Sequence, residues 1–128
     1  MDSIYDLIIV GGGPAGLSAA IYAGRSERQT LLLEKGSYGG RINDTYEIRN
    51  YPGTIVDSGQ HLMERFREHA ASHPTVELKR TTVTGIRKEG DLFVVETKRR
   101  GDFKAHSVVL DLGTRPRELG LKGEQEFT

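Results

Sequence analysis

Hydrophobic residues form two short uninterrupted runs near the start of the chain, Leu7–Val10 and Leu31–Leu33, within predicted strands at residues 6–10 and 30–33. Uninterrupted apolarity is typical of a strand covered on both faces, as in a parallel sheet, whereas a half-exposed strand alternates. Between the runs, residues 14–25 are rich in alanine and begin with Pro14, which suits the first turn of a helix. This order predicts a βαβ unit with a right-handed crossover.

The pattern then changes twice. Residues 35–55 show no sustained period and contain several glycines, so they predict a long loop, and such loops in compact domains are usually functional. Residues 57–73 predict a second helix, because Leu62, Met63 and Phe66 fall on one helical face. Pro74 marks the end of this helix.

The rest of the regular pattern predicts short strands at 76–78, 81–88, 91–98, 103–106 and 107–111. The alternation around the turn Glu89-Gly90 predicts a hairpin, and its expected core residues are Val83, Ile86, Phe93 and Val95. With residues 103–106 the hairpin would make an antiparallel β-meander of three strands. We interpret residues 107–111 as a separate return to the parallel sheet.

These elements predict an α/β fold of three layers, the FAD/NAD(P)-binding Rossmann-like fold, in which an antiparallel β-meander forms a crossover from the parallel sheet. A plain NAD-binding domain would continue with alternating strands and helices. The meander therefore favours the FAD type found in flavoproteins that bind two dinucleotides.

Composition limits the class of protein. The 128 residues suit one domain, and 18 basic residues balance 18 acidic ones, so no overall field attracts nucleic acid or an anionic membrane. The apolar runs are too short to span a bilayer, and the N-terminus does not resemble a signal peptide, so we expect a cytoplasmic protein. The absence of cysteine excludes thiolate metal sites and cysteine nucleophiles within these residues.

The motif that carries chemistry is the run of glycines after the first strand. Gly11, Gly12, Gly13, Pro14, Ala15 and Gly16 satisfy G-x-G-x-x-G between a predicted strand and a predicted helix. Gly11 would allow the tight turn, Gly13 the close approach of a pyrophosphate, and Gly16 the packing of helix on strand. The helix N-terminus would offer unpaired N–H groups and partial positive charge to the phosphates.

An acidic residue supports this interpretation. Glu34 follows Gly16 by eighteen residues, near the spacing of about twenty expected for an acid that binds ribose hydroxyls. A carboxylate there would repel a 2′-phosphate, so the site should not prefer NADP. A glycine-rich turn without a ligand would not explain Glu34 at the end of an apolar strand. The fingerprint alone leaves FAD and NAD open, since both contain ADP.

Several longer segments resemble one family. They are residues 11–23, 31–35, 39–40, 47–53, 62–65, 113–117 and 123–124, including the sequence Asn-Tyr-Pro-Gly at 50–53. On these segments nearly the whole chain resembles the N-terminal part of a low-molecular-weight bacterial thioredoxin reductase, a class II pyridine nucleotide-disulfide oxidoreductase. The Asn-Tyr-Pro-Gly segment is much more specific than the phosphate motif.

The resemblance implies a set of FAD-binding residues. Residues 11–16, with Glu34 and Lys35, would hold the ADP half of FAD. The other implied contacts are Gly40 and Arg41 along the cofactor, Asn50 at the isoalloxazine, the Val83 backbone at the adenine and Gly113 where the chain passes closely. No catalytic residue and no metal ligand is expected in this stretch.

The resemblance also implies the chemistry of the parent enzyme. NADPH, or ferredoxin in some similar proteins, would reduce FAD, and FAD would reduce a Cys-x-x-C pair that serves a thioredoxin-like disulfide protein. That pair and the NAD(P)H site would lie in a second domain beyond Thr128, with residues 117–128 as the linker. The FAD domain would be completed by a C-terminal segment, and the enzyme is expected to be a homodimer.

Two departures and two alternatives stay open at this point. Arg41 stands where the family usually has glutamine, and Asp111-Leu112 stands where it has Ala-Thr. Burial of Asp111 near a pyrophosphate would be unfavourable unless it is paired or turned to solvent. The chain could instead be a stand-alone FAD- or ADP-binding module without turnover, or the front end of another FAD-dependent oxidoreductase.

Two further groups of residues have a simpler interpretation. His69 and His73 have a spacing that can bind metal, but no acid or cysteine completes a site, so we expect a solvated helix end. The basic residues 98–100 lack interleaved aromatic residues, so a solvated hairpin end is favoured over a nucleic-acid patch.

Overall fold

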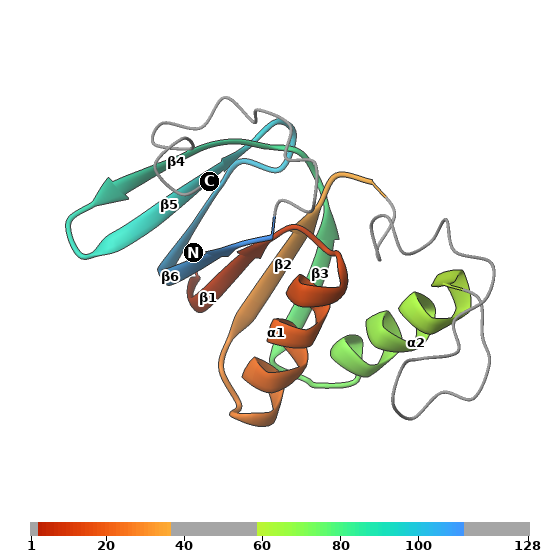
Figure 1. The fold of residues 1–128 in the computed structure, drawn as a ribbon. Coiled ribbons are helices and arrows are strands. Elements are labelled where there is room, and N and C mark those ends of the chain that lie inside the picture. Colours follow the sequence, from red (N-terminus) through yellow and green to blue (C-terminus); the bar gives the residue numbers. More distant parts are fainter. Residues whose placement is uncertain (1–2, 37–58, 112–128) are drawn as a thin grey trace.

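The computed structural model describes residues 3–36 and 59–111. In these residues the elements are β1 (Ile4–Val10), α1 (Pro14–Arg25), β2 (Thr30–Glu34), α2 (Gly59–Ala71), β3 (Val76–Arg80), β4 (Val83–Glu89), β5 (Leu92–Thr97) and β6 (Asp102–Leu110) (Figure 1). The described strands form one sheet in the order β3-β2-β1-β6-β5-β4. The predicted start of the second helix at residues 57–58 lies outside the described residues.

The parallel part of the sheet is the predicted βαβ unit extended by two strands. β1 pairs in parallel with β2, from Leu7 opposite Thr30 to Val10 opposite Leu33. β3 lies on the far side of β2, and β6 on the far side of β1. Because all four strands run the same way, their carboxyl ends meet at one edge of the sheet, where ligands of open α/β sheets bind.

The antiparallel part corrects one prediction. Residues 103–106 and 107–111 were expected to be separate strands, but residues 102–110 form the single strand β6. A strand has two hydrogen-bonding edges: residues 104–110 pair in parallel with β1 on one edge, while residues 102–105 pair antiparallel with β5 on the other. Residues 106–110 have no partner on that second edge among the described strands.

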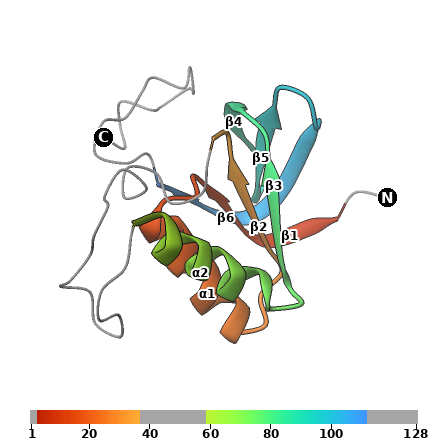
Figure 2. The same cartoon turned by 90° about the vertical axis from the view of Figure 1, so that its right-hand side faces the viewer.

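A hydrophobic core lies on each face of the parallel strands, which gives the predicted three layers. On one face, α1 and α2 pack over Ile9, Leu32 and Val76. On the other face, Val83 and Val95 of the β4–β5 hairpin share a core with Leu31. Figure 2 shows the helices and the hairpin on opposite sides of the parallel strands. Of the predicted hairpin core, Ile86 and Phe93 are only half-buried.

The two cores predict the effect of substitutions in β2. Leu31 and Leu32 are adjacent, fully buried and on opposite faces. We expect Leu31→Ala and Leu32→Ala each to lower the free energy of unfolding by about 2–5 kcal/mol, since each leaves a cavity in a separate core. Urea denaturation measures the loss. Ile4→Ala, at a side chain that is 48% exposed, is the control and should cost under about 1 kcal/mol. A leucine variant as mild as the control would contradict a sheet buried on both faces.

Candidate dinucleotide-binding site

The glycine motif forms the turn between the carboxyl end of β1 and the start of α1. Gly11 has a φ of +111°, a conformation that side chains disfavour, and its N–H donates to Leu33 O of β2 at 2.8 Å. A Cβ at Gly11 would collide with Asp111 O, and a Cβ at Gly16 would collide with Gly11 O. The predicted roles of Gly11 in the turn and of Gly16 in helix–strand packing are therefore confirmed.

The N-terminus of α1 is open to solvent. Gly13 is the N-cap and has no side chain that could cap the helix, and Pro14 lacks an N–H. Pro14 and Ala15 are exposed. Among the described residues, no acceptor is bonded to the N–H groups of Gly13 and Ala15. The first turn thus presents free donors and the positive end of the helix dipole, the combination that binds phosphate.

Glu34 lies beside this turn, as predicted. Its Oε1 accepts from the Gly12 N–H at 2.8 Å, and its Oε2 accepts from the Gly36 N–H at 2.6 Å. The carboxylate therefore joins the end of β2 to the glycine turn. Lys35, the next residue, is exposed at the same edge of the sheet.

The segment that leads into β4 lies at this edge too. The N–H of Thr81 donates to Glu34 O at 3.0 Å, and Val83 begins β4 two residues later. The Val83 side chain is buried in the core, so a ligand could meet only its backbone, as the resemblance implies. The Thr81 Oγ1 is buried without a hydrogen-bond partner, and sequence reasoning did not identify it.

Asp111 lies on the other side of the turn. Its N–H continues the β-ladder by donating to Val10 O at 2.8 Å, and its Oδ2 accepts from the Gly16 N–H at 2.9 Å. Asp111 is only half-buried, and its carboxylate is paired with a backbone donor, the condition under which the sequence analysis allowed an acid at this position. The signal available in the sequence was an acidic residue directly after an apolar strand.

These residues fit a dinucleotide. The glycines of the turn carry no side chain that would block a pyrophosphate, and the N–H groups of Gly13 and Ala15 have no acceptor among the described residues. The Glu34 carboxylate and the unpartnered Thr81 hydroxyl lie beside the turn. The remaining predicted contacts, Gly40, Arg41, Asn50 and Gly113, lie outside the described residues.

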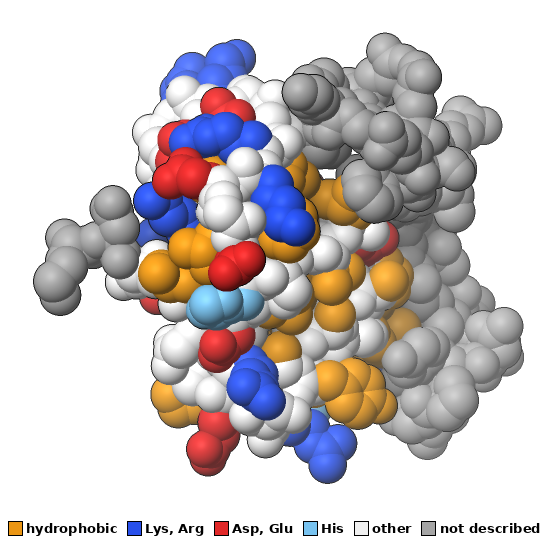
Figure 3. Space-filling view, turned by 90° about the vertical axis from the view of Figure 1, so that its left-hand side faces the viewer, with side chains coloured by type: hydrophobic (Ala, Val, Ile, Leu, Met, Phe, Trp, Pro, Cys, Tyr) orange, Lys and Arg blue, Asp and Glu red, His pale blue; other side chains and the backbone are white. Residues whose placement is uncertain are grey.

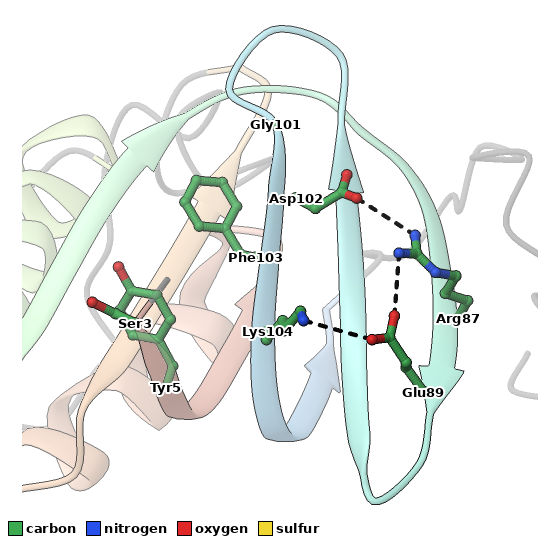
Figure 4. A pocket seen from close by; sticks show the side chains of 8 residues that line it. All are labelled: Ser3, Tyr5, Arg87, Glu89, Gly101, Asp102, Phe103 and Lys104. Carbon is green, nitrogen blue, oxygen red and sulfur yellow. Dashed lines mark hydrogen bonds and ion pairs between the residues drawn. The ribbon is translucent and has the colours of Figure 1, made fainter. Parts of the chain in front are cut away.

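A cavity lies at the opposite end of β1 from the glycine turn. It measures about 690 Å³ and is lined by Tyr5 and by charged residues of the meander (Figure 4). Arg87 pairs with Glu89 and Asp102, and Lys104 pairs with Glu89. The charged side chains that line this cavity are thus paired with one another.

One face of the described structure is mixed in character. On the face drawn in Figure 3, acidic and basic side chains are interspersed. The rings of His69 and His73 stack with centroids 5.7 Å apart, and no group of three potential metal ligands occurs in residues 3–36 and 59–111. In the same ranges, no helix is long and apolar enough to cross a membrane.

Comparison with known proteins agrees with this geometry. A family model described as pyridine nucleotide-disulphide oxidoreductase matches residues 5–128. The thioredoxin reductase of Peptoclostridium acidaminophilum is 38% identical over 129 aligned positions, covering 100% of this chain and 40% of that protein.

Solved structures of thioredoxin reductases are similar as well. That of Lactococcus lactis has a TM-score of 0.80 and 41% identity, covering 96% of this chain and 40% of its own. That of Streptococcus pyogenes has a TM-score of 0.82 and 35% identity, covering 99% of this chain and 41% of its own. The chain thus spans about 40% of the length of these relatives.

The glycine geometry predicts different outcomes at two positions of the motif. Gly16→Ala would place a Cβ against the backbone Gly11 O, which cannot move without the strand, so we expect a loss of about 3 kcal/mol or more in unfolding free energy. Gly13→Ala would meet only the Asp111 side chain, at 3.0 Å, and should cost about 1 kcal/mol or less. Thermal and urea unfolding compare the two variants. Equal losses would contradict the close approach of α1 to β1.

Proposed function

This chain belongs to the pyridine nucleotide-disulphide oxidoreductase family, and on that premise we propose that it is the FAD-binding portion of a thioredoxin-reductase-like enzyme. Residues 11–16, with Glu34 and Lys35, hold the ADP half of FAD. The observation that carries the proposal is the open first turn of α1, with free N–H donors, next to the carboxylate of Glu34.

The choice of FAD over NAD is supported by the sheet. The crossover between the parallel strands β3 and β6 is the antiparallel hairpin of β4 and β5, which covers the face opposite the helices. The same arrangement of elements occurs in the thioredoxin reductases that the fold matches. We infer that Gly40 and Arg41 lie along the cofactor, Asn50 reaches its ring system, the Val83 backbone meets the adenine and Gly113 permits close passage.

The proposed activity belongs to the whole protein. Electrons pass from NADPH, or from ferredoxin, to a disulfide of a thioredoxin-like protein, and FAD supplies the two-electron carrier between them. In this proposal the 128 residues bind and orient the cofactor. They contain no cysteine, so the thiol pair is supplied by other residues of the enzyme. NADPH binding requires a domain additional to the one described.

The remaining architecture is proposed on the same basis. Residues 117–128 form the linker toward an NAD(P)H domain. The second edge of β6, unpaired at residues 106–110 among the described strands, accepts a strand from the segment that completes the FAD domain. The enzyme is a homodimer in the cytoplasm and binds neither nucleic acid nor membrane.

Cofactor binding tests the proposal directly. We expect the purified intact protein, freed of ligand, to take up one FAD per chain, seen as a shift in flavin absorbance and a change in flavin fluorescence. ADP should compete with FAD, because the glycine turn and Glu34 recognise the half that the two ligands share. The proposal would be wrong if the protein took up no FAD, or if ADP did not reduce the uptake of FAD.

Glu34 should also determine how well adenosine ligands with and without a 2′-phosphate compete with FAD. Its carboxylate would repel a 2′-phosphate, so ADP should displace FAD at least about tenfold better than 2′-phospho-ADP. Glu34→Gln keeps an acceptor for the Gly12 N–H but removes the charge, and should reduce that preference severalfold.

The matched control for Glu34 is Glu77→Gln. Glu77 lies on β3 and accepts from the Tyr5 hydroxyl at 3.1 Å, away from the carboxyl ends of the strands. This variant should leave the preference for ADP unchanged. If Glu34→Gln also leaves it unchanged, Glu34 does not face the ribose.

A further inference from the structure

The helix that begins at the glycine turn is capped by a residue from a distant strand. The Asp111 Oδ2 accepts from the N–H of Gly16, the third residue of α1, although the two are separated by 95 positions in sequence. A side-chain oxygen on this N–H is the usual role of an N-cap residue. Gly13 occupies the N-cap position and has no side chain, so Asp111 supplies the cap in its place.

The motif leaves little room around this carboxylate. A Cβ at Gly13 would lie 3.0 Å from Asp111 Oδ2, and a Cβ at Gly16 would lie 3.1 Å from it. Gly13, which would let a pyrophosphate approach, and Gly16, which lets α1 pack on β1, therefore both border the carboxylate. The Asp111 Oδ2 therefore lies close to the backbone of the turn to which the pyrophosphate of a dinucleotide would bind.

The charge of Asp111 is not balanced by a cation in the described structure. The ion pairs of residues 3–36 and 59–111 do not include Asp111. Its negative charge is stabilised by the Gly16 N–H and by the positive end of α1. A pyrophosphate bound to the same turn would draw on the same helix end and add a second anion beside the first.

We propose that Asp111 is an affinity-determining residue: it caps α1 with an anion in the ligand-free protein and repels the pyrophosphate of the dinucleotide that binds there. This inference rests on the proposed function, since it concerns the same site. It assigns one residue two opposed effects. The carboxylate stabilises the ligand-free fold, and it weakens the binding of FAD.

The test compares FAD affinity of the intact protein with that of Asp111→Asn and Asp111→Ala. Asparagine keeps an acceptor for the Gly16 N–H but removes the charge. We expect Asp111→Asn to bind FAD on the order of tenfold more tightly, the effect of removing one charge several ångströms from another in partly solvated surroundings. The gain should shrink at high salt, because ions screen the repulsion.

Two readouts separate this charge effect from a structural one. Asp111→Ala should also bind FAD more tightly, yet its ligand-free form should unfold a few degrees lower, because Gly16 loses its acceptor. Direct binding of ADP should tighten in both variants as that of FAD does, while direct binding of adenosine, which lacks phosphate, should not.

Asp6→Asn is the matched control. The Asp6 Oδ2 also accepts from a backbone N–H, that of Gln29 at 2.8 Å, but near the opposite end of β1. This variant loses the same charge and should leave FAD affinity unchanged.

Three outcomes would contradict the proposed role of Asp111. Equal FAD affinity in the parent protein and Asp111→Asn would overturn the inference and leave the proposed function standing. An equal gain in Asp6→Asn would also overturn it, since the effect would then come from net charge. If neither protein binds FAD, the proposed function fails, and the inference fails with it.

Discussion

The structure depends on the close approach of α1 to β1 at the glycine turn. The Gly16 Cα lies so near the Gly11 carbonyl that no side chain fits between them, and Gly11 itself takes a positive φ. This contact sets where α1 crosses the sheet, and so which residues of β1 and β2 it buries. The same contact leaves the first turn of the helix at the carboxyl edge of the parallel strands, where the N–H groups of Gly13 and Ala15 have no acceptor among the described residues.

Parallel pairing brings the site residues together from three parts of the chain. β1 lies between β2 and β6, so the ends of these strands, Val10, Glu34 and Asp111, meet at one edge. Two carboxylates thereby flank the glycine turn, and each accepts from one of its N–H groups. Glu34 accepts from the N–H of Gly12, and Asp111 accepts from the N–H of Gly16 in the first turn of the helix. The positive end of the helix is thus bordered by two negative charges, and in the site that we propose these charges oppose the binding of a phosphate.

Much of this could be predicted from the sequence because the signals are local. The uninterrupted apolar runs predicted β1 and β2, the alanine-rich segment after Pro14 predicted α1 with its observed bounds, and Glu89-Gly90 predicted the hairpin. The glycine spacing predicted the tight turn before α1, with Glu34 at the end of the next strand, and longer segments predicted the family that the comparisons confirm. Each of these rests on the preferences of a residue and its near neighbours along the chain.

Tertiary structure alone decided the features that depend on strand pairing. The sequence predicted two strands between residues 103 and 111, because the chain changes from alternating to apolar there, but one strand uses both of its edges for different partners. The position of Asp111 depends on the register of β6 against β1, which joins residues about a hundred positions apart. A local pattern shows that a residue can lie in a strand, whereas the side chains that meet across the sheet depend on which strands pair, and packing of the whole domain determines that.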